Sequence, residues 1–364
     1  MAEMRKQRML VMENGSVHYG YGFGSGKDCL CELVFNTAVV GYQELVTDPG
    51  CMGQGVVMTY PLIGNYGITA EDNESRMPAL GALIVREYCD EPSNFRYVQT
   101  LAEFMEDNGV VGLEGVDTRT ITQMIRDEGS QLGLICDADT AVEDAMARIK
   151  AYEQPHDLIS QVSCKKKWYA RTPNPSYNVV AVDCGIKQNI VRLLNQCGCN
   201  VTVVPFDTPA ETILSMKPDG VVISNGPGDP RDAKATIETI RQLRGKLPLF
   251  GISAGYQMIC LAAGAKVSKM KAGHHGGNQP VREVKTGKVI ITSQGHSYVV
   301  DEASLADTVL TVSYKNVLDG TVEGVEGDKI IGVQFHPEGA PGPQDSDYLF
   351  KQFIDMMKEA SKNA

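Results

Sequence analysis

The stretch LFGISAGYQMICLAA, residues 249–263, passes from a short apolar run to a helical pattern without a loop between them. Leu249–Ile252 has the length and composition of a buried strand, and the small and apolar residues from Ala254 onward favour a helix. The junction carries the pattern G-x-S-x-G, whose small flanking residues allow a sharp strand-to-helix turn that presents the central side chain. The stretch predicts an α/β fold, with Ser253 as a candidate nucleophile at the amino end of a helix.

Apolar runs of the same kind recur on both sides of this stretch and alternate with helical stretches. That rhythm is typical of βαβ units, so we expect a parallel-rich sheet with helices on both faces. Asp232 is placed to cap the helix that follows it, and an apolar stripe near residue 350 fits a closing amphipathic helix. The runs are Val179–Val182, Val201–Val204, Val221–Ile223 and Ile330–Val333, the helical stretches are Gln188–Gln196 and Ala233–Leu243, and the stripe is Leu349, Phe350, Phe353, Ile354 and Met357.

The first part of the chain has a different pattern, in which short β-rich runs alternate with Gly/Pro turns and one helix is indicated at Thr118–Asp127. This pattern predicts a mixed α+β domain over residues 1–150. Three prolines and the basic run Lys165–Lys167 favour a linker over residues 151–177, followed by the α/β domain at 178–360. The β-rich runs are Cys31–Phe35, Gly55–Thr59 and Gly81–Val85.

Length and charge narrow the class of protein. The 364 residues suffice for two or three domains, and 34 Lys and Arg against 45 Asp and Glu give a net charge of −11. An acidic surface repels phosphate backbones, so we expect no nucleic-acid partner. The apolar run Met9–Met12 is far too short for a signal sequence and no 18-residue uncharged apolar stretch occurs, so we expect a cytoplasmic protein without membrane association.

Ten cysteines are scattered along the chain, and the two close pairs, Cys29/Cys31 and Cys197/Cys199, have the spacing C-x-C. No C-x-x-C occurs, and no histidine lies at ligand spacing from either pair, so we expect reduced thiols and no metal site. The glycine-rich stretch Gly20–Lys27 matches neither G-x-G-x-x-G nor a P-loop, and a turn between strands is expected there.

Two further motifs follow predicted strands and therefore belong at the carboxyl edge of the sheet, where α/β proteins bind ligands. Ser224–Pro230 contains Gly226 and Gly228, and its backbone N–H groups suit an oxyanion hole, although such a turn is often only a tight connection. In His336-Pro337-Glu338 the carboxylate can orient the imidazole as a general base. The order serine, histidine, acid is not that of the serine α/β-hydrolases. It fits the layout of a Cys-His-Glu amide hydrolase with the nucleophile changed.

With these residues in view, the chain resembles, almost end to end, the small subunit of carbamoyl phosphate synthetase, a class I glutamine amidotransferase. The matches occur in both halves of the chain. They are Val34-Phe35-Asn36-Thr37, Gly41-Tyr42-Gln43-Glu44, Thr47-Asp48-Pro49, Tyr60 to Gly67, Glu71 to Arg76, Val116-Asp117-Thr118-Arg119, Ser224 to Pro230, His275-Gly276-Gly277-Asn278 and Phe335-His336-Pro337-Glu338.

The resemblance implies that the chain hydrolyses L-glutamine and passes ammonia to a large subunit, which makes carbamoyl phosphate from bicarbonate and ATP. ATP and Mg are then expected on the large subunit and no cofactor on this chain, and the product would serve pyrimidine or arginine synthesis. The family's catalytic positions fall on Ser253, His336 and Glu338. Its glutamine and oxyanion site implies substrate-binding roles for Gly226, Gly228, Ala254, Gln257, Ser297 and Tyr298.

Several family positions are changed, and the resemblance places these changes in the glutamine pocket. Ser253 stands where the family has its nucleophilic cysteine, and Ala254 and Tyr256 replace the leucine and histidine of C-L-G-H-Q. Ala38 replaces a glutamine-contacting serine, and the family's Asn-His-Gly-Phe loop begins with Gly295. Because a serine hydroxyl is a weaker nucleophile than a thiolate, we expect weak glutaminase activity.

Four hypotheses remain open from the sequence. The chain works as a glutaminase through Ser253, serves as an ammonia-dependent or regulatory subunit, is an engineered knock-out of the nucleophile, or is a scaffold for the large subunit. A knock-out explains Ser253 but not Ala38, Tyr256 and Gly295. A scaffold does not need the retained set of Gln257, His336 and Glu338.

Overall fold

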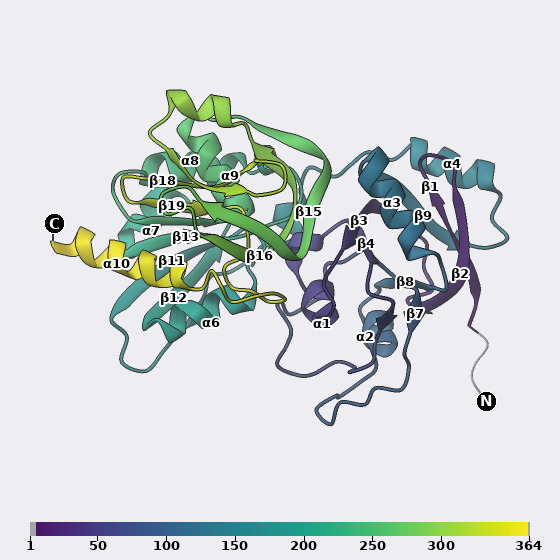
Figure 1. The fold of residues 1–364 in the computed structure, drawn as a ribbon. Helices are drawn as coiled ribbons and strands as arrows, with labels where there is room; N and C mark the ends of the chain where they lie inside the picture. Colours follow the sequence, from purple (N-terminus) through teal and green to yellow (C-terminus); the bar gives the residue numbers. More distant parts are fainter. Residues whose placement is uncertain (1–4, 363–364) are drawn as a thin grey trace. The chain divides into compact units, whose positions relative to one another are not determined.

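The computed structural model describes residues 5–362, which divide into two units (Figure 1). Unit 1 comprises residues 5–155 and 271–275, and unit 2 comprises residues 156–270 and 276–362. Residues 1–4, which begin the predicted first domain, lie outside the described residues. No helix within residues 5–362 has the length and apolar character needed to cross a lipid bilayer.

Unit 1 is a closed seven-stranded barrel with helices packed on it, and thus a mixed α+β domain. One face of the strands forms a single apolar cluster, which Ile121 and Ile125 of the helix α3 join. In barrel order the strands are β1 (Gln7–Met12), β2 (Val17–Gly24), β8 (Val111–Glu114), β6 (Ala82–Ile84), β4 (Gln54–Met58), β3 (Cys29–Asn36) and β9 (Gln131–Asp137); β5 (Leu62–Ile63) and β7 (Glu87–Tyr88) form a separate pair. The helices are α1 (Tyr42–Val46), η1 (Pro49–Cys51), α2 (Leu101–Asp107), α3 (Thr118–Glu128) and α4 (Val142–Lys150).

The glycine-rich stretch Gly20–Lys27 is only partly the turn that the sequence predicted. Its first half continues β2 as far as Gly24, and the turn is confined to residues 25–28. A Cβ at Gly20 would lie 2.2 Å from the carbonyl oxygen of Glu114 on β8. Glycine is therefore required here for two strands of the barrel to approach closely, rather than for a turn or for phosphate binding.

Unit 2 is built on a ten-stranded sheet whose centre is parallel, as the βαβ rhythm predicted. The neighbours β12, β11, β13, β14 and β19 run parallel, and antiparallel strands extend the sheet on both sides. In sheet order the strands are β10 (Trp168–Ala170), β12 (Cys199–Pro205), β11 (Tyr177–Asp183), β13 (Gly220–Ile223), β14 (Leu249–Ile252), β19 (Ile330–Val333), β18 (Val322–Gly327), β17 (Thr311–Asn316), β15 (Val267–Glu283) and β16 (Val289–Val300).

Helices cover both faces of this sheet (Figure 1). Successive residues of each buried strand point to opposite faces, so Val179 packs with α6 and α10 while Val180 packs with α7, α8 and α9. The closing helix α10 buries the predicted stripe except for the half-buried Ile354, and packs Phe350 and Phe353 against Phe250. The helices are α5 (Leu158–Val162), α6 (Gln188–Gln196), α7 (Ala210–Ser215), η2 (Pro230–Asp232), α8 (Lys234–Leu243), α9 (Ala254–Ala263), η3 (Glu302–Asp307) and α10 (Tyr348–Lys362).

Two local expectations differ from the structure. The stretch 151–177, expected as a linker, contains the helix α5 and the strand β10, and β10 pairs with β12 as the last strand of the sheet. Asp232 does not cap α8, because the N-cap position is Ala233 and no side chain caps that helix. Asp232 instead ends the short helix η2, and its carboxylate lies 3.0 Å from Nδ1 of His156.

Candidate active site

Three neighbouring parallel strands of unit 2 end at the same edge of the sheet, and each is followed by one of the predicted motifs. β13 pairs with β14 up to Ile223 and Gly251, and β14 pairs with β19 up to Ile252 and Val333. The segment 224–230 therefore follows β13, Ser253 follows β14, and the segment 334–338 follows β19. The sheet topology collects the three motifs at one edge although they are far apart in the sequence.

Ser253 lies in the strained turn that the G-x-S-x-G pattern predicted. Its φ of 54° and ψ of −113° are rare for a residue with a side chain, and its N–H donates to the carbonyl of Val333 at 2.8 Å. A Cβ at Gly255 would lie 2.1 Å from the carbonyl oxygen of Ile223. The turn thus needs glycine at position 255 so that α9 can start directly against β13.

His336 and Glu338 are joined as the H-x-E spacing predicted. Nδ1 of His336 lies 2.7 Å from Oε1 of Glu338, and both side chains are buried. The backbone N–H of His336 donates to the carbonyl of Ser293 at 2.8 Å, which holds the segment against β16. Because a carboxylate can only accept, the neutral imidazole carries its proton on Nδ1 and leaves a lone pair on Nε2, as a general base requires.

Lys187, which the sequence analysis did not select, completes a buried group of charges. Its Nζ lies 3.0 Å from the same oxygen, Oε1 of Glu338, and the Lys187 side chain is only 2% exposed. Burial by itself raises the pKa of Glu338, but Lys187 and His336 outweigh burial and hold that pKa below its ordinary value. Glu338 is therefore a carboxylate over the whole neutral range.

Nothing in the local sequence around Lys187 marks it as functional, but the topology does. It follows β11, the parallel neighbour of β13, and so it reaches the same edge of the sheet from a fourth strand. Asn189, on the first turn of α6, donates to the backbone carbonyl of Glu338 at 2.6 Å. The loop between β11 and α6 thus holds Glu338 by both its side chain and its backbone.

Gln257 and Tyr298, both expected to bind substrate, bind each other. The Gln257 amide nitrogen donates to the carbonyl of Tyr298 at 2.8 Å and to Oε1 of Gln334 at 2.7 Å. The backbone N–H of Gln257 donates to the carbonyl of Ser253 at 3.2 Å. The segment that contains Ser297 and Tyr298 is thereby connected to the turn that carries Ser253.

The remaining predicted residues lie at the same edge. Ala254 is the first residue of α9, and Gly226 and Gly228 are half-buried in the loop after β13. That loop continues into Asp229, whose carboxylate accepts from the guanidinium of Arg231 at 2.9 Å, and this guanidinium lies 5.9 Å from the centre of the Tyr298 ring. Burial alone raises the pKa of Asp229, but its hydrogen bonds to Arg231 and Tyr298 lower it overall.

The departures from the family do not all lie in a pocket, and in this respect our expectation is wrong for Tyr256. Its ring is fully buried in the core between α9 and the sheet, and its hydroxyl donates to the carbonyl of Val322 at 3.3 Å. Gly295 is exposed, with open space where a side chain would project. Ala38 belongs to unit 1, where its N–H donates to Oδ1 of Asn36.

Comparison with known proteins agrees with this geometry. The profile of the family "Glutamine amidotransferase class-I" matches residues 180–356, and that of "Carbamoyl-phosphate synthase small chain, CPSase domain" matches residues 10–135. The carbamoyl phosphate synthase small chain of Staphylococcus saprophyticus is 47% identical over 358 residues, which cover 98% of this chain and 97% of that protein. The chain belongs to the carbamoyl phosphate synthase small chain family.

Other relatives give the same assignment. The pyrimidine-specific small chain of Halalkalibacterium halodurans is 46% identical, with 98% of this chain and 99% of that protein covered. The small chain of Staphylococcus epidermidis is 48% identical, with coverage of 98% and 97%. The role of the chain is accordingly that of a small, glutamine amidotransferase subunit of carbamoyl phosphate synthase.

Proposed function

We propose that this chain hydrolyses the side-chain amide of L-glutamine at Ser253 and delivers the ammonia to a large subunit in the cytoplasm. There the ammonia would enter carbamoyl phosphate synthesis from bicarbonate and ATP. The observation that carries the proposal is the buried His336–Glu338 pair, which follows β19, the strand next to the one that ends at the Ser253 turn. A general base held in this tautomer beside a strained serine is the arrangement that nucleophilic amide hydrolysis requires.

In the proposed reaction, Nε2 of His336 takes the hydroxyl proton as Oγ of Ser253 attacks the amide carbon of glutamine. Negative charge develops on the amide oxygen, and the N–H groups of Gly226, Gly228 and Ala254 are the donors expected to receive it. The imidazolium then gives its proton to the leaving nitrogen, which departs as ammonia. Water, deprotonated by the same imidazole, cleaves the resulting ester and releases glutamate.

Glu338 and Lys187 act on the base rather than on the substrate. The Glu338 carboxylate, 2.7 Å from Nδ1, stabilises the imidazolium that forms during attack and prevents the ring from rotating. Lys187 keeps that carboxylate ionised in a buried setting. Lys187 is therefore a positioning residue for Glu338, as Glu338 is for His336.

The proposed reaction is slow for a chemical reason. A cysteine is already partly thiolate at neutral pH, whereas serine depends on proton removal during the attack itself. A low rate of glutamine turnover is thus the expected behaviour of an intact site that contains serine. With a low rate of glutamine turnover, free ammonium can serve as a second source of nitrogen for the large subunit.

The test is to reconstitute the chain with a large subunit and to supply either amide-¹⁵N-labelled glutamine or ammonium. We expect labelled carbamoyl phosphate from glutamine, at a rate below that from saturating ammonium, and loss of the glutamine-dependent rate in His336→Asn. The rate from ammonium should be unchanged in that variant. If the unmodified complex forms carbamoyl phosphate with ammonium but none with glutamine, glutamine hydrolysis is overturned and an ammonia-dependent subunit is favoured.

A further inference from the structure

Two cysteine thiols lie next to each other at the start of β3 in unit 1. Cys29 and Cys31 are two residues apart, so their side chains project from the same face of the strand, and they are hydrogen-bonded to each other. A Cβ at Gly81 would lie 3.4 Å from Sγ of Cys29, and a Cβ at Gly55 would lie 2.5 Å from Sγ of Cys31. Cys29 is half-buried, whereas Cys31 is only 1% exposed. A small molecule in solution can therefore reach Cys29 but not Cys31.

A buried arginine with unused hydrogen-bond donors lies beside Cys29. The Arg8 side chain is only 1% exposed, and within residues 5–362 its Nε and Nη1 have no hydrogen-bond partner. Its Nη2 donates to the carboxylate of Asp28 at 2.9 Å and to the carbonyl of Ile135 at 3.4 Å. Asp28 precedes Cys29 in the chain and Ile135 pairs with Cys29 across β3 and β9, so both contacts hold the guanidinium next to this thiol. Buried polar groups are nearly always hydrogen-bonded, so the two unused nitrogens point to an acceptor that the reduced chain does not supply.

The charges around Arg8 favour an anion as that acceptor. Asp28, which accepts from Arg8, also pairs with Arg148 at 2.7 Å. Asp137 lies 3.7 Å from Nε of Arg8 and pairs with Lys6 at 2.5 Å. Two carboxylates are thus shared among three cations, and this group of side chains carries a net positive charge. A negative charge beside Arg8 is stabilised by that charge as well as by the two unused donors.

The two thiols differ in acidity. The hydrogen bond with Cys31 lowers the pKa of Cys29, burial raises it and the charge of Arg8 lowers it further, so that this pKa lies below its ordinary value. The same hydrogen bond, together with burial, raises the pKa of Cys31 well above its ordinary value. Cys29 is therefore the more readily ionised thiol, and Cys31 is the donor that supports it. A partly exposed thiol of lowered pKa in a positively charged environment is the kind that oxidants attack.

We propose that Cys29 is a modification site, at which hydrogen peroxide oxidises the thiolate to a sulfenate that Arg8 holds. This inference goes beyond the proposed function and does not depend on it. The Cys29 sulfur attacks one peroxide oxygen and the O–O bond breaks. The hydroxide that leaves takes the proton of the new S–OH group, which gives water and the sulfenate. Sulfur is oxidised by two electrons and the peroxide is reduced by two.

The sulfenate oxygen is the acceptor that Nε and Nη1 of Arg8 lack. A disulfide between Cys29 and Cys31 is the competing product. Residues two apart in an extended strand have Cα atoms about 6.6 Å apart, at the upper end of the range that disulfides span. We therefore expect the sulfenate to persist rather than to condense with the neighbouring thiol.

The test treats the full chain with hydrogen peroxide in the presence of dimedone, which traps sulfenic acids, and locates the adducts by peptide mass spectrometry. Cys197 is the matched internal control, because it is also half-buried and belongs to a C-x-C pair, but burial raises its pKa. The adduct should form on Cys29 at least about tenfold faster than on Cys197. Equal rates at the two cysteines would overturn the proposal. A disulfide between Cys29 and Cys31 in place of the adduct would overturn it as well.

Variants test the assigned roles of the neighbours. Arg8→Met should slow adduct formation on Cys29 by about tenfold and leave the rate at Cys197 unchanged. The six buried thiols report on folding, because they react with iodoacetamide only after unfolding. If Arg8→Met does not fold, the comparison of Cys31→Ala with Cys31→Ser carries the test. The first should slow the reaction at Cys29, whereas the second keeps a hydrogen-bond donor and should not. An unchanged rate at Cys29 in folded Arg8→Met, or in Cys31→Ala, would show that the neighbours do not activate this thiol and would overturn the proposal.

Discussion

At the scale of single residues, the general base and its orienting groups are intact, whereas the nucleophile is changed. The base and its orienting groups, His336, Glu338 and Lys187, form a connected set with distances of 2.7 and 3.0 Å. The nucleophile position has the backbone of a reactive turn but carries a hydroxyl. The hydroxyl at position 253 therefore limits the proposed reaction more than the arrangement of the base and its orienting groups does.

Ser253→Cys should raise glutamine hydrolysis by about 100-fold or more, because a thiolate does not depend on base catalysis during the attack. The rate should still remain below that of relatives with a complete pocket, since Gly295 supplies no side chain. Release of labelled ammonia from glutamine by the reconstituted complex measures this. Complete recovery in Ser253→Cys, with no further gain in Ser253→Cys/Gly295→Asn, would show that Gly295 costs the site nothing.

Lys187→Met should destabilise the chain by about 3–5 kcal/mol near pH 7, because it leaves the buried Glu338 carboxylate without its cation. Since the folded pKa of Glu338 is lowered, the stability given by the ion pair is present above the unfolded carboxyl pKa of about 4.3. That stability is lost as the pH falls through the lower folded pKa. The deficit of the variant should thus stay constant from pH 7 to about pH 5 and shrink only as the pH falls below about 4, as measured by urea unfolding.

The double variant Lys187→Met/Glu338→Gln is the control for this pair. Removing both charges should recover most of the stability lost in Lys187→Met, because no ionised group is left buried without a partner. If the double variant is as unstable as the two single changes combined, Lys187 contributes through packing of its side chain. The charge argument would then be wrong.

At the scale of elements, the turn between β14 and α9 tolerates no change in its glycines. Gly255→Ala places a methyl group against the backbone oxygen of Ile223, which cannot move without displacing β13. We expect a loss of about 3 kcal/mol or more, or failure to fold. Gly295→Ala is the matched control, because a Cβ there meets open space, and it should change stability by less than about 0.5 kcal/mol. Thermal unfolding compares the two, and similar losses would contradict the steric argument.

The central elements could be predicted because each strand is an apolar run that is buried on both faces. β11, β13, β14 and β19, with Ser253, His336 and Glu338 at their ends, follow directly from such runs and from the carboxyl-edge rule. The strand β10 could not be predicted in this way. As the last strand of the sheet it needs no continuous apolar run, and Tyr169 within it is exposed.

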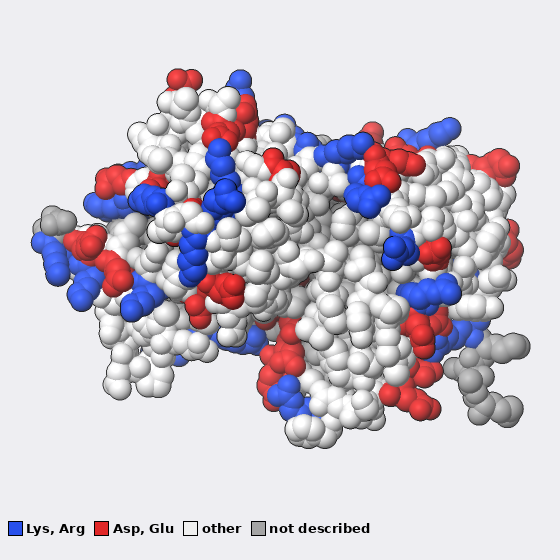
Figure 2. All heavy atoms as spheres, viewed as in Figure 1, with Lys and Arg blue, Asp and Glu red and all other residues white. Residues whose placement is uncertain are grey.

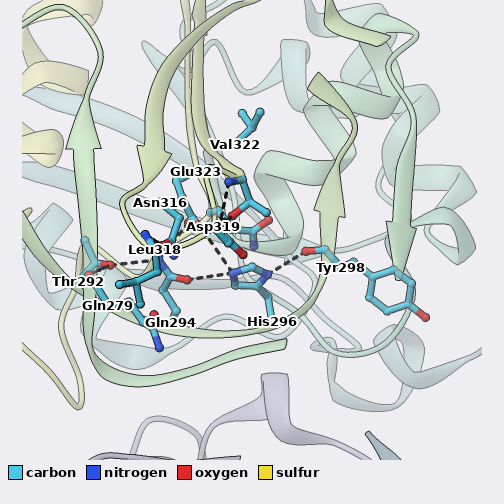
Figure 3. Close-up of polar contacts among 12 residues, drawn as sticks. Gln279, Thr292, Gln294, His296, Tyr298, Asn316, Leu318, Asp319, Val322 and Glu323 are labelled. Carbon is cyan, nitrogen blue, oxygen red and sulfur yellow. Dashed lines mark hydrogen bonds and ion pairs between the residues drawn. The ribbon is translucent and has the colours of Figure 1, made fainter. Parts of the chain in front are cut away.

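Side chains that act through tertiary contacts could not be predicted from the sequence either. Lys187 reads as an ordinary lysine before a helix, and only the neighbouring position of β11 and β13 brings it to Glu338. Glu323 has no local sequence signal beyond that of a strand residue. Its hydrogen bond to Gln294 (Figure 3) joins residues 29 positions apart and could not be predicted. Asp232 is a residue type that often caps helices, but here it is the last residue of the helix η2, which starts at Pro230 and precedes α8.

At the scale of the whole molecule, the surface carries charges of both signs and the cysteines are present as thiols. On the face drawn in Figure 2, acidic and basic side chains are interspersed over both units. All ten cysteines are free thiols, and Cys31, Cys51, Cys136, Cys184, Cys199 and Cys260 are buried. Burial raises the pKa of Cys184 and of Cys199 to about 12, so neither is a thiolate at neutral pH.

Stability should therefore be independent of reducing agent. We expect the same unfolding temperature with and without dithiothreitol, because no disulfide constrains the unfolded chain. A thiol-specific reagent should label the half-buried Cys29, Cys89, Cys164 and Cys197 in the native protein, and the other six only after unfolding. A lower unfolding temperature in dithiothreitol would show that a disulfide forms in solution.

The strained turn at residue 253 also affects which substitutions this protein can accept during evolution. Its shape is set by Gly255, by the start of α9 and by the bond from the Ser253 N–H to Val333, none of which involves the side chain at position 253. Serine and cysteine codons can differ by a single base, and the two side chains have nearly the same shape. A point mutation at this position can therefore shift the balance between glutamine and dissolved ammonium as nitrogen sources, in either direction, without altering the turn.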